Sequence, residues 1–139
     1  MATNRPRHSG RRPSHRSCRG PGHAGGRLGR IVSVSSLSAE NGSAGMAPYA
    51  TAKAGLHGMT GVLADEFGGD GILSNAVMPG MVLTERNRER PEDVREAVAE
   101  RTPSDRISTP EDVAALVAFL GSEANGNVNG AVVPVTGGL

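Results

Sequence analysis

The chain has 139 residues, which is the size of one domain, and its net charge of +1 hides two unlike parts. Residues 1–30 carry eight arginines and no acidic residue, whereas residues 31–139 carry seven basic and fourteen acidic residues. No stretch is apolar over the length needed to span a bilayer, which argues against a membrane protein. The single cysteine, Cys18, has no partner for a disulfide, which fits a reducing, cytoplasmic location.

Residues 1–28 are rich in arginine, glycine and proline and contain almost nothing to bury, so we expect a disordered basic tail. Such a tail can bind phosphates, but it has no aromatic side chain to stack on bases, so nucleic acid is not an expected partner. Organelle targeting is a second interpretation. A third is translation from an incorrect start or frame, suggested by the abrupt change of composition that follows.

The first ordered elements are expected to be a strand and a long helix. A β-branched run at 31–35 predicts a strand buried in a parallel sheet, with Ser35 and Ser36 where it ends. A glycine-containing loop then leads to a helix over 48–67, which Gly68-Gly69 can end in left-handed geometry. Residues Ala52, Leu56, Met59 and Leu63 recur at helical spacing and predict the apolar stripe of a buried helix.

The remaining segments alternate between strands and helices. An apolar strand at 72–80 is followed by a charged helix over 91–101. Thr109 is expected to cap a helix over 110–121, whose apolar face consists of Val113, Leu116, Val117 and Leu120. A last strand lies within 131–138. This alternation predicts an α/β fold with a parallel sheet.

The helix over 48–67 carries the only tyrosine and the only lysine of the chain, Tyr49 and Lys53. Residues four apart lie on one face of a helix, so a phenol and an ammonium are placed side by side. A cation held against a phenol favours its ionised form, which makes proton exchange near neutral pH easier. Taken alone, the pair also fits a bland interpretation, with Tyr49 as a helix-start aromatic and Lys53 as a solvated side chain.

The motifs together resemble the second half of the short-chain dehydrogenases/reductases, over residues 29–139. Ser36 precedes Tyr49 by thirteen residues, the spacing that this family uses. The matching segments, in unbroken order, are GRIVSVSS, PYATAKAGLHGMT, SNAVMPGMVLT, TPEDVAALVAFLGSEAN and NGAVVPVTGG. The resemblance implies a Rossmann-like, doubly wound parallel sheet represented by its last three strands and their helices.

The resemblance also implies an oxidoreductase that interconverts an alcohol and a ketone with NAD or NADP. Tyr49 would be the general acid/base, and Lys53 would favour its ionised form and hydrogen-bond the nicotinamide ribose. Ser36 would hold the substrate oxygen, with Ser35 as the neighbouring candidate. The expected partners are a small-molecule alcohol or ketone and a second copy of the chain packed through the Tyr49 helix.

Cofactor contacts are implied in the segment that follows the strand at 72–80. Pro79 and Gly80, the backbone of Val82, and Thr84 would contact the nicotinamide carboxamide and the phosphates. Asn75 is expected to be structural instead. The charged segment 81–108 corresponds to a variable loop over the substrate, and its charges are expected to be a solvated surface rather than a substrate-binding patch. No metal site is expected.

The family's first half has no counterpart in the chain. A strand followed by a glycine-rich turn and a helix is missing, as is the asparagine of the family's catalytic tetrad. We therefore expect weak or no cofactor binding by this chain alone. The alternative to an active oxidoreductase is a catalytically inactive remnant that only self-associates.

Overall fold

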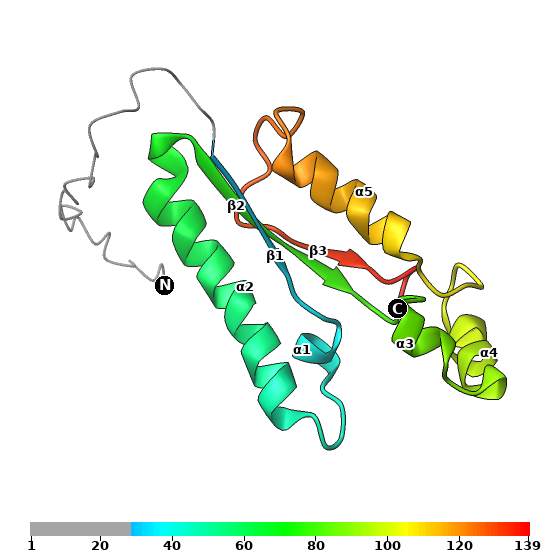
Figure 1. The fold of residues 1–139 in the computed structure, drawn as a ribbon. Coiled ribbons are helices and arrows are strands. Elements are labelled where there is room, and N and C mark those ends of the chain that lie inside the picture. The colour runs from blue at the N-terminus through cyan, green and yellow to red at the C-terminus, as the bar shows by residue number, and fades with distance from the viewer. Residues whose placement is uncertain (1–28) are drawn as a thin grey trace, which may run out of the picture.

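The computed structural model describes residues 29–139, so the expected disorder of residues 1–28 lies outside the described part. Figure 1 shows a long helix and a shorter helix on either side of a small sheet, with the remaining short helices at the end where the strands finish. The elements in chain order are β1 (Gly29–Val34), α1 (Ser38–Asn41), α2 (Ala47–Phe67), the 3-10 turn η1 (Gly68–Asp70), β2 (Ile72–Pro79), α3 (Glu85–Arg88), α4 (Glu92–Arg101), α5 (Pro110–Gly121) and β3 (Val132–Val135).

The three described strands form one parallel sheet in the order β1-β2-β3. The central strand β2 is buried from Leu73 to Pro79, because its two edges are paired and its two faces are covered. Helix α2 packs on one face and α5 on the other (Figure 1). Such double coverage is what a continuous apolar strand requires. The predicted α/β fold with a parallel sheet is therefore confirmed.

Helix α2 differs from the prediction in the face it buries. Ala52 and Met59 of the expected apolar stripe are exposed, and only Thr60 is fully buried. The residues of α2 that are at least partly buried are Ala50, Lys53, Leu56, His57, Thr60, Leu63 and Ala64. Small and apolar residues occur on every side of this helix, so helical spacing alone did not define its inner face. The expectation of a buried helix is wrong for the described chain.

The end of α2 also differs from the prediction. Gly68 has right-handed backbone angles and begins η1. The left-handed residue is Gly71, with φ of 79°, whose amide donates to the Gly68 carbonyl at 3.1 Å. Gly68 and Gly69 therefore continue the chain into one turn of 3-10 helix, and the left-handed residue comes after that turn, at Gly71.

Helix α5 begins with the predicted capping box. The Thr109 hydroxyl accepts from the Asp112 amide, and the Asp112 carboxylate accepts from the Thr109 amide at 2.8 Å. Arg106 donates to the same carboxylate at 2.6 Å. Each of the four residues predicted to form the apolar face is at least partly buried, and Leu120 is fully buried.

Asn75 of β2 joins the central strand to the segment that leads into β3. This side chain is fully buried, its amide donates to the Val128 carbonyl at 2.7 Å, and its oxygen accepts from the Ala131 amide at 3.1 Å. Asn129 makes a second link, since it accepts from the Ser74 amide and donates to the Ala64 carbonyl at the end of α2. These contacts agree with the expectation that Asn75 is structural.

Among residues 29–139, no helix combines the length and the apolar character needed to cross a membrane.

The capping box predicts how stability depends on pH. The pKa of Asp112 is lowered to about 2, first by the hydrogen bond from Arg106 and then by that from the Thr109 amide. A carboxyl whose pKa is lower in the folded state stabilises the fold above its unfolded pKa of about 4, and this stability is lost as pH falls toward about 2. We expect Asp112→Asn to be less stable than the parent at neutral pH, with the difference shrinking over that window.

Urea unfolding followed by circular dichroism across pH measures this difference. Glu100→Gln is the matched control, because Glu100 is an exposed helical carboxyl with no hydrogen bond in the described chain. An equal stability difference for Asp112→Asn at about pH 2.5 and about pH 6 would contradict the assignment.

Candidate active site

The carboxyl ends of β1, β2 and β3 meet at one rim, because the three strands are parallel. The segments that leave the rim are tied to one another. The Leu37 amide donates to the Pro79 carbonyl at 2.8 Å, and the Gly80 amide donates to the Val135 carbonyl at 3.1 Å. This rim brings together the chain after β1, where the serines lie, and the chain after β2, where the cofactor contacts were predicted.

Tyr49 and Lys53 lie side by side near the start of α2. The Lys53 Nζ is 5.8 Å from the centroid of the Tyr49 ring, within the range of a cation–π contact. It also donates to the Val34 carbonyl at the end of β1, at 2.8 Å. Tyr49 is 42% exposed, so this residue lies at the surface of the described chain. The arrangement agrees with the spacing argument, and the catalytic roles stay predictions.

The two serines after β1 occupy different environments. Ser35 is buried, and its Oγ contacts α2. Ser36 is half-buried at the rim, and its Oγ accepts from the Ser38 amide at 3.3 Å. No hydrogen bond joins Ser36 to Tyr49 within the described residues, and catalytic hydrogen bonds are often long before a substrate is bound. Ser36 is thus the more exposed of the two serines, and its role at the site stays a prediction.

The segment after β2 is held in place by its own contacts. Val82 forms an isolated parallel β-bridge with Ser108. The Val82 carbonyl also accepts from the Thr84 amide at 2.7 Å and from the Asn87 side chain at 2.8 Å. Thr84 precedes α3 without a side-chain capping bond, so its hydroxyl remains available. A side chain at Gly80 would meet Thr136 only at ordinary contact distance, so packing alone does not require glycine there.

These residues fit one end of a nicotinamide dinucleotide. Lys53 supplies a cation, and Tyr49, Ser36 and Thr84 supply hydroxyls, which suits a ribose, a carboxamide and an alcohol or ketone oxygen.

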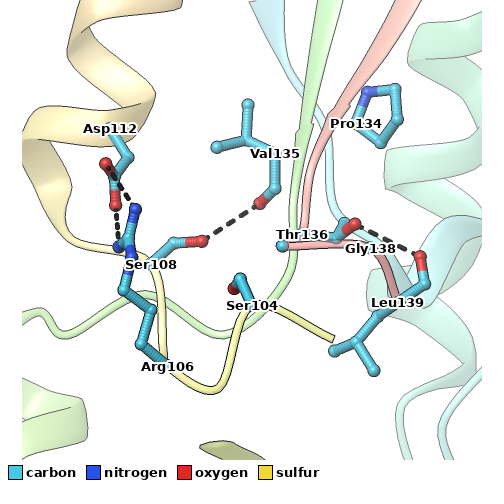
Figure 2. Close-up of a pocket in the computed structure, with 10 residues that line it drawn as sticks. Ser104, Arg106, Ser108, Asp112, Pro134, Val135, Thr136, Gly138 and Leu139 are labelled. Atoms are coloured by element: carbon cyan, nitrogen blue, oxygen red, sulfur yellow. Dashed lines mark hydrogen bonds and ion pairs between the residues drawn. The ribbon is translucent and has the colours of Figure 1, made fainter. Parts of the chain in front are cut away.

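A surface hollow of about 400 Å³ lies elsewhere on the rim, beyond the end of β3 (Figure 2). It is lined by Arg106 and Asp112, which face each other, and by the last residues of the chain. Tyr49, Lys53 and Ser36 do not line it. Since its most polar wall is an ion pair already satisfied within α5 and its capping segment, we place the candidate site at the start of α2.

His57 is the residue that the sequence analysis missed. It lies four positions after Lys53 on the inner face of α2, and its Nε2 is 2.7 Å from Ser35 Oγ. The same i to i+4 spacing that drew attention to Tyr49 and Lys53 applies to Lys53 and His57. The contact itself joins residues 22 positions apart and depends on how α2 packs on β1.

Comparisons with known proteins show which family this chain resembles. The family model described as enoyl-(acyl carrier protein) reductase matches residues 17–139. The chain is 45% identical over 113 residues to a 3-oxoacyl-(acyl-carrier-protein) reductase of Pseudomonas aeruginosa, over 81% of this chain and 46% of that protein. It is 43% identical over 116 residues to a (3R)-3-hydroxyacyl-CoA dehydrogenase of Mus musculus, over 84% of this chain and 44% of that protein.

A solved structure is also similar. The short-chain dehydrogenase/reductase of Brucella melitensis, named glucose/ribitol dehydrogenase, matches with a TM-score of 0.73 at 31% identity, over 80% of this chain and 46% of that chain. The chain belongs to the short-chain dehydrogenases/reductases, a family of oxidoreductases, as its motifs predicted. It spans about half the length of the curated relatives it matches.

Proposed function

We propose that the chain provides the proton-transfer residues of an NAD- or NADP-dependent oxidoreductase that interconverts an alcohol and a ketone. The observation that carries this proposal is the contact between Lys53 and Tyr49, with Nζ 5.8 Å from the ring centroid at the rim of a parallel sheet. Family membership supports the reaction type. The half-exposed Ser36, on the loop that leaves the same rim, supplies the third group.

The reduction requires a hydride and a proton, and the bound cofactor would supply the hydride. The Ser36 hydroxyl would donate a hydrogen bond to the ketone oxygen, where negative charge develops. Tyr49 would transfer its phenolic proton to that oxygen, which completes the alcohol. The Lys53 ammonium would stabilise the phenolate that remains. Because Tyr49 is 42% exposed, water could restore its proton.

The substrate class that we propose is a 3-oxoacyl thioester or its 3-hydroxy product. Both curated relatives described above are named for such acyl groups, carried by acyl carrier protein in one and by coenzyme A in the other. The keto oxygen of such a substrate would accept from Ser36 and Tyr49. The charged helices α3 and α4 lie at the same end of the sheet as this rim (Figure 1).

A chimera tests the roles of the residues without depending on what the chain lacks. Residues 29–139 are fused behind the first half of the Pseudomonas aeruginosa reductase, and reduction of acetoacetyl-CoA is followed by loss of reduced cofactor. We expect turnover, and we expect Tyr49→Phe to lower kcat by about 10²–10⁴, because the ring is kept and the transferable proton is lost.

Thr51→Val in the same chimera is the matched control, since Thr51 is exposed two residues away on α2. We expect it to retain kcat. Turnover by Tyr49→Phe equal to that of the parent chimera would contradict the role of the phenol.

We further propose that copies of the chain associate through the outer face of α2. Val62 is 54% exposed and Met59 is 42% exposed on this face, and Gly55 and Gly58 beside them let another backbone approach closely. This surface also fits the alternative of a catalytically inactive remnant that only self-associates. Weak or absent binding in a titration with reduced cofactor is the result expected for the chain alone.

Val62→Glu tests the association. A carboxylate buried at a contact between copies is costly, so we expect this variant to sediment as a smaller species than the parent chain. Val94→Glu is the matched control, because Val94 is an exposed valine on α4, away from the proposed face. Equal sedimentation of the two variants would contradict an interface on α2.

A further inference from the structure

A single buried hydroxyl joins the end of β1 to the reactive turn of α2. Ser35 is 3% exposed, and its Oγ is 3.0 Å from the Lys53 carbonyl and 2.7 Å from His57 Nε2. Both partners come from consecutive turns of α2. None of these contacts is needed to form the helix or the strand, so they specify how one lies on the other.

The hydrogen positions of this cluster follow from its chemistry. A carbonyl oxygen can only accept, so the one proton of the Ser35 hydroxyl is used toward Lys53. The hydroxyl oxygen must then accept from His57, which requires a proton on Nε2. Neutral His57 is therefore the Nε2–H tautomer. Nε2 also carries a proton when the ring is charged, so the hydrogen bond is kept in both states.

Lys53 is anchored to β1 at two points. Its carbonyl accepts from Ser35, and its Nζ donates to the carbonyl of the preceding residue, Val34, at 2.8 Å. The Ser35 amide donates to Val77 of β2, so the Val34 carbonyl, in the same peptide group, points to the opposite side of β1. Lys53 thus reaches the side of β1 that faces away from β2, and its position depends on the register between α2 and β1.

We propose that Ser35 and His57 are positioning residues that hold Lys53, and with it Tyr49, at the rim. This inference rests on the proposed function only for its catalytic meaning. His57 fixes the orientation of the Ser35 hydroxyl, Ser35 fixes the Lys53 carbonyl, and the ammonium of Lys53 then meets Val34 and the Tyr49 ring. Neither Ser35 nor His57 contacts the substrate.

A serine beside a histidine also resembles a nucleophile with its base. Two observations oppose that interpretation here. The Ser35 proton is directed to a backbone carbonyl rather than to the ring, so His57 cannot remove it in this arrangement. Ser35 is also buried between α2 and the sheet, where no substrate can reach it. The cluster positions Lys53 and performs no acyl transfer.

The tautomer is measured by long-range proton–nitrogen NMR spectra of the full chain labelled at histidine. His57 is identified by the signal that disappears in His57→Gln, and the three histidines of residues 1–28 serve as internal comparison. We expect a proton on Nε2 of neutral His57. A proton on Nδ1 instead would overturn the proposal, because Ser35 would then have to donate to the ring.

How firmly the Lys53 side chain is held is measured by its rate of acetylation in the full chain. Mass spectrometry locates the modified residue, and the chain has no other lysine. Loss of one hydrogen bond corresponds to a rate increase of about fivefold. We expect this increase in Ser35→Ala and in His57→Leu. In His57→Gln, whose amide can replace the Nε2–H donor, we expect a rate close to that of the parent chain.

Thr60→Val is the matched control, because Thr60 is fully buried on the same face of α2 and its hydroxyl has no partner in the described chain. A general loosening of α2 would raise the acetylation rate of Lys53 in this variant as well. Equal acetylation rates in Ser35→Ala and Thr60→Val would therefore overturn the proposal. If Ser35→Ala does not fold, the proposal is still tested by the tautomer of His57 and by the acetylation rates of His57→Leu and His57→Gln. Neither measurement uses cofactor or turnover. A chimera without turnover would therefore contradict the proposed function and leave this result unchanged.

Discussion

The contact between α2 and the carboxyl end of β1 is the constraint on which the candidate site depends. Lys53 forms two hydrogen bonds across this contact, one from its Nζ to the Val34 carbonyl and one from the Ser35 hydroxyl to its own carbonyl. Helix geometry alone places Tyr49 and Lys53 on one face of α2, but only this contact brings that face to the rim where the strands end. A rotation of the helix would leave the phenol and the ammonium together but would break both of these contacts with β1.

Local signals predicted much of this structure, and tertiary contacts account for the rest. The capping box of α5, its apolar face and the buried strand β2 follow from short segments of sequence, and each is confirmed. The single-turn helices α1 and α3 were not predicted, because four residues are too few for a periodic pattern. The inner face of α2 was predicted wrongly, because it includes Lys53, His57 and Thr60 and packs on a sheet face that includes Ser35.

The site was predictable to a different extent in each of its parts. The proximity of Tyr49 and Lys53 follows from their spacing of four residues on a helix, and the structure places the two side chains next to each other. The pairing of Ser35 with His57 spans 22 residues and could not be read from spacing without knowing how the helix lies on the sheet. The contacts for the rest of the cofactor could not be derived, since the chain covers 46% of the Pseudomonas aeruginosa reductase that it resembles.

The arrangement of Tyr49 and Lys53 can be measured directly by nuclear Overhauser spectroscopy of the full, uniformly labelled chain. Each is the only residue of its type, so a cross-peak between the tyrosine ring and the lysine side chain has one assignment. We expect cross-peaks from the ring protons of Tyr49 to the methylene protons of Lys53, and from those methylenes to Val34. Absence of both sets, with Lys53 shifts typical of an unfolded peptide, would contradict a proton-transfer site at this rim.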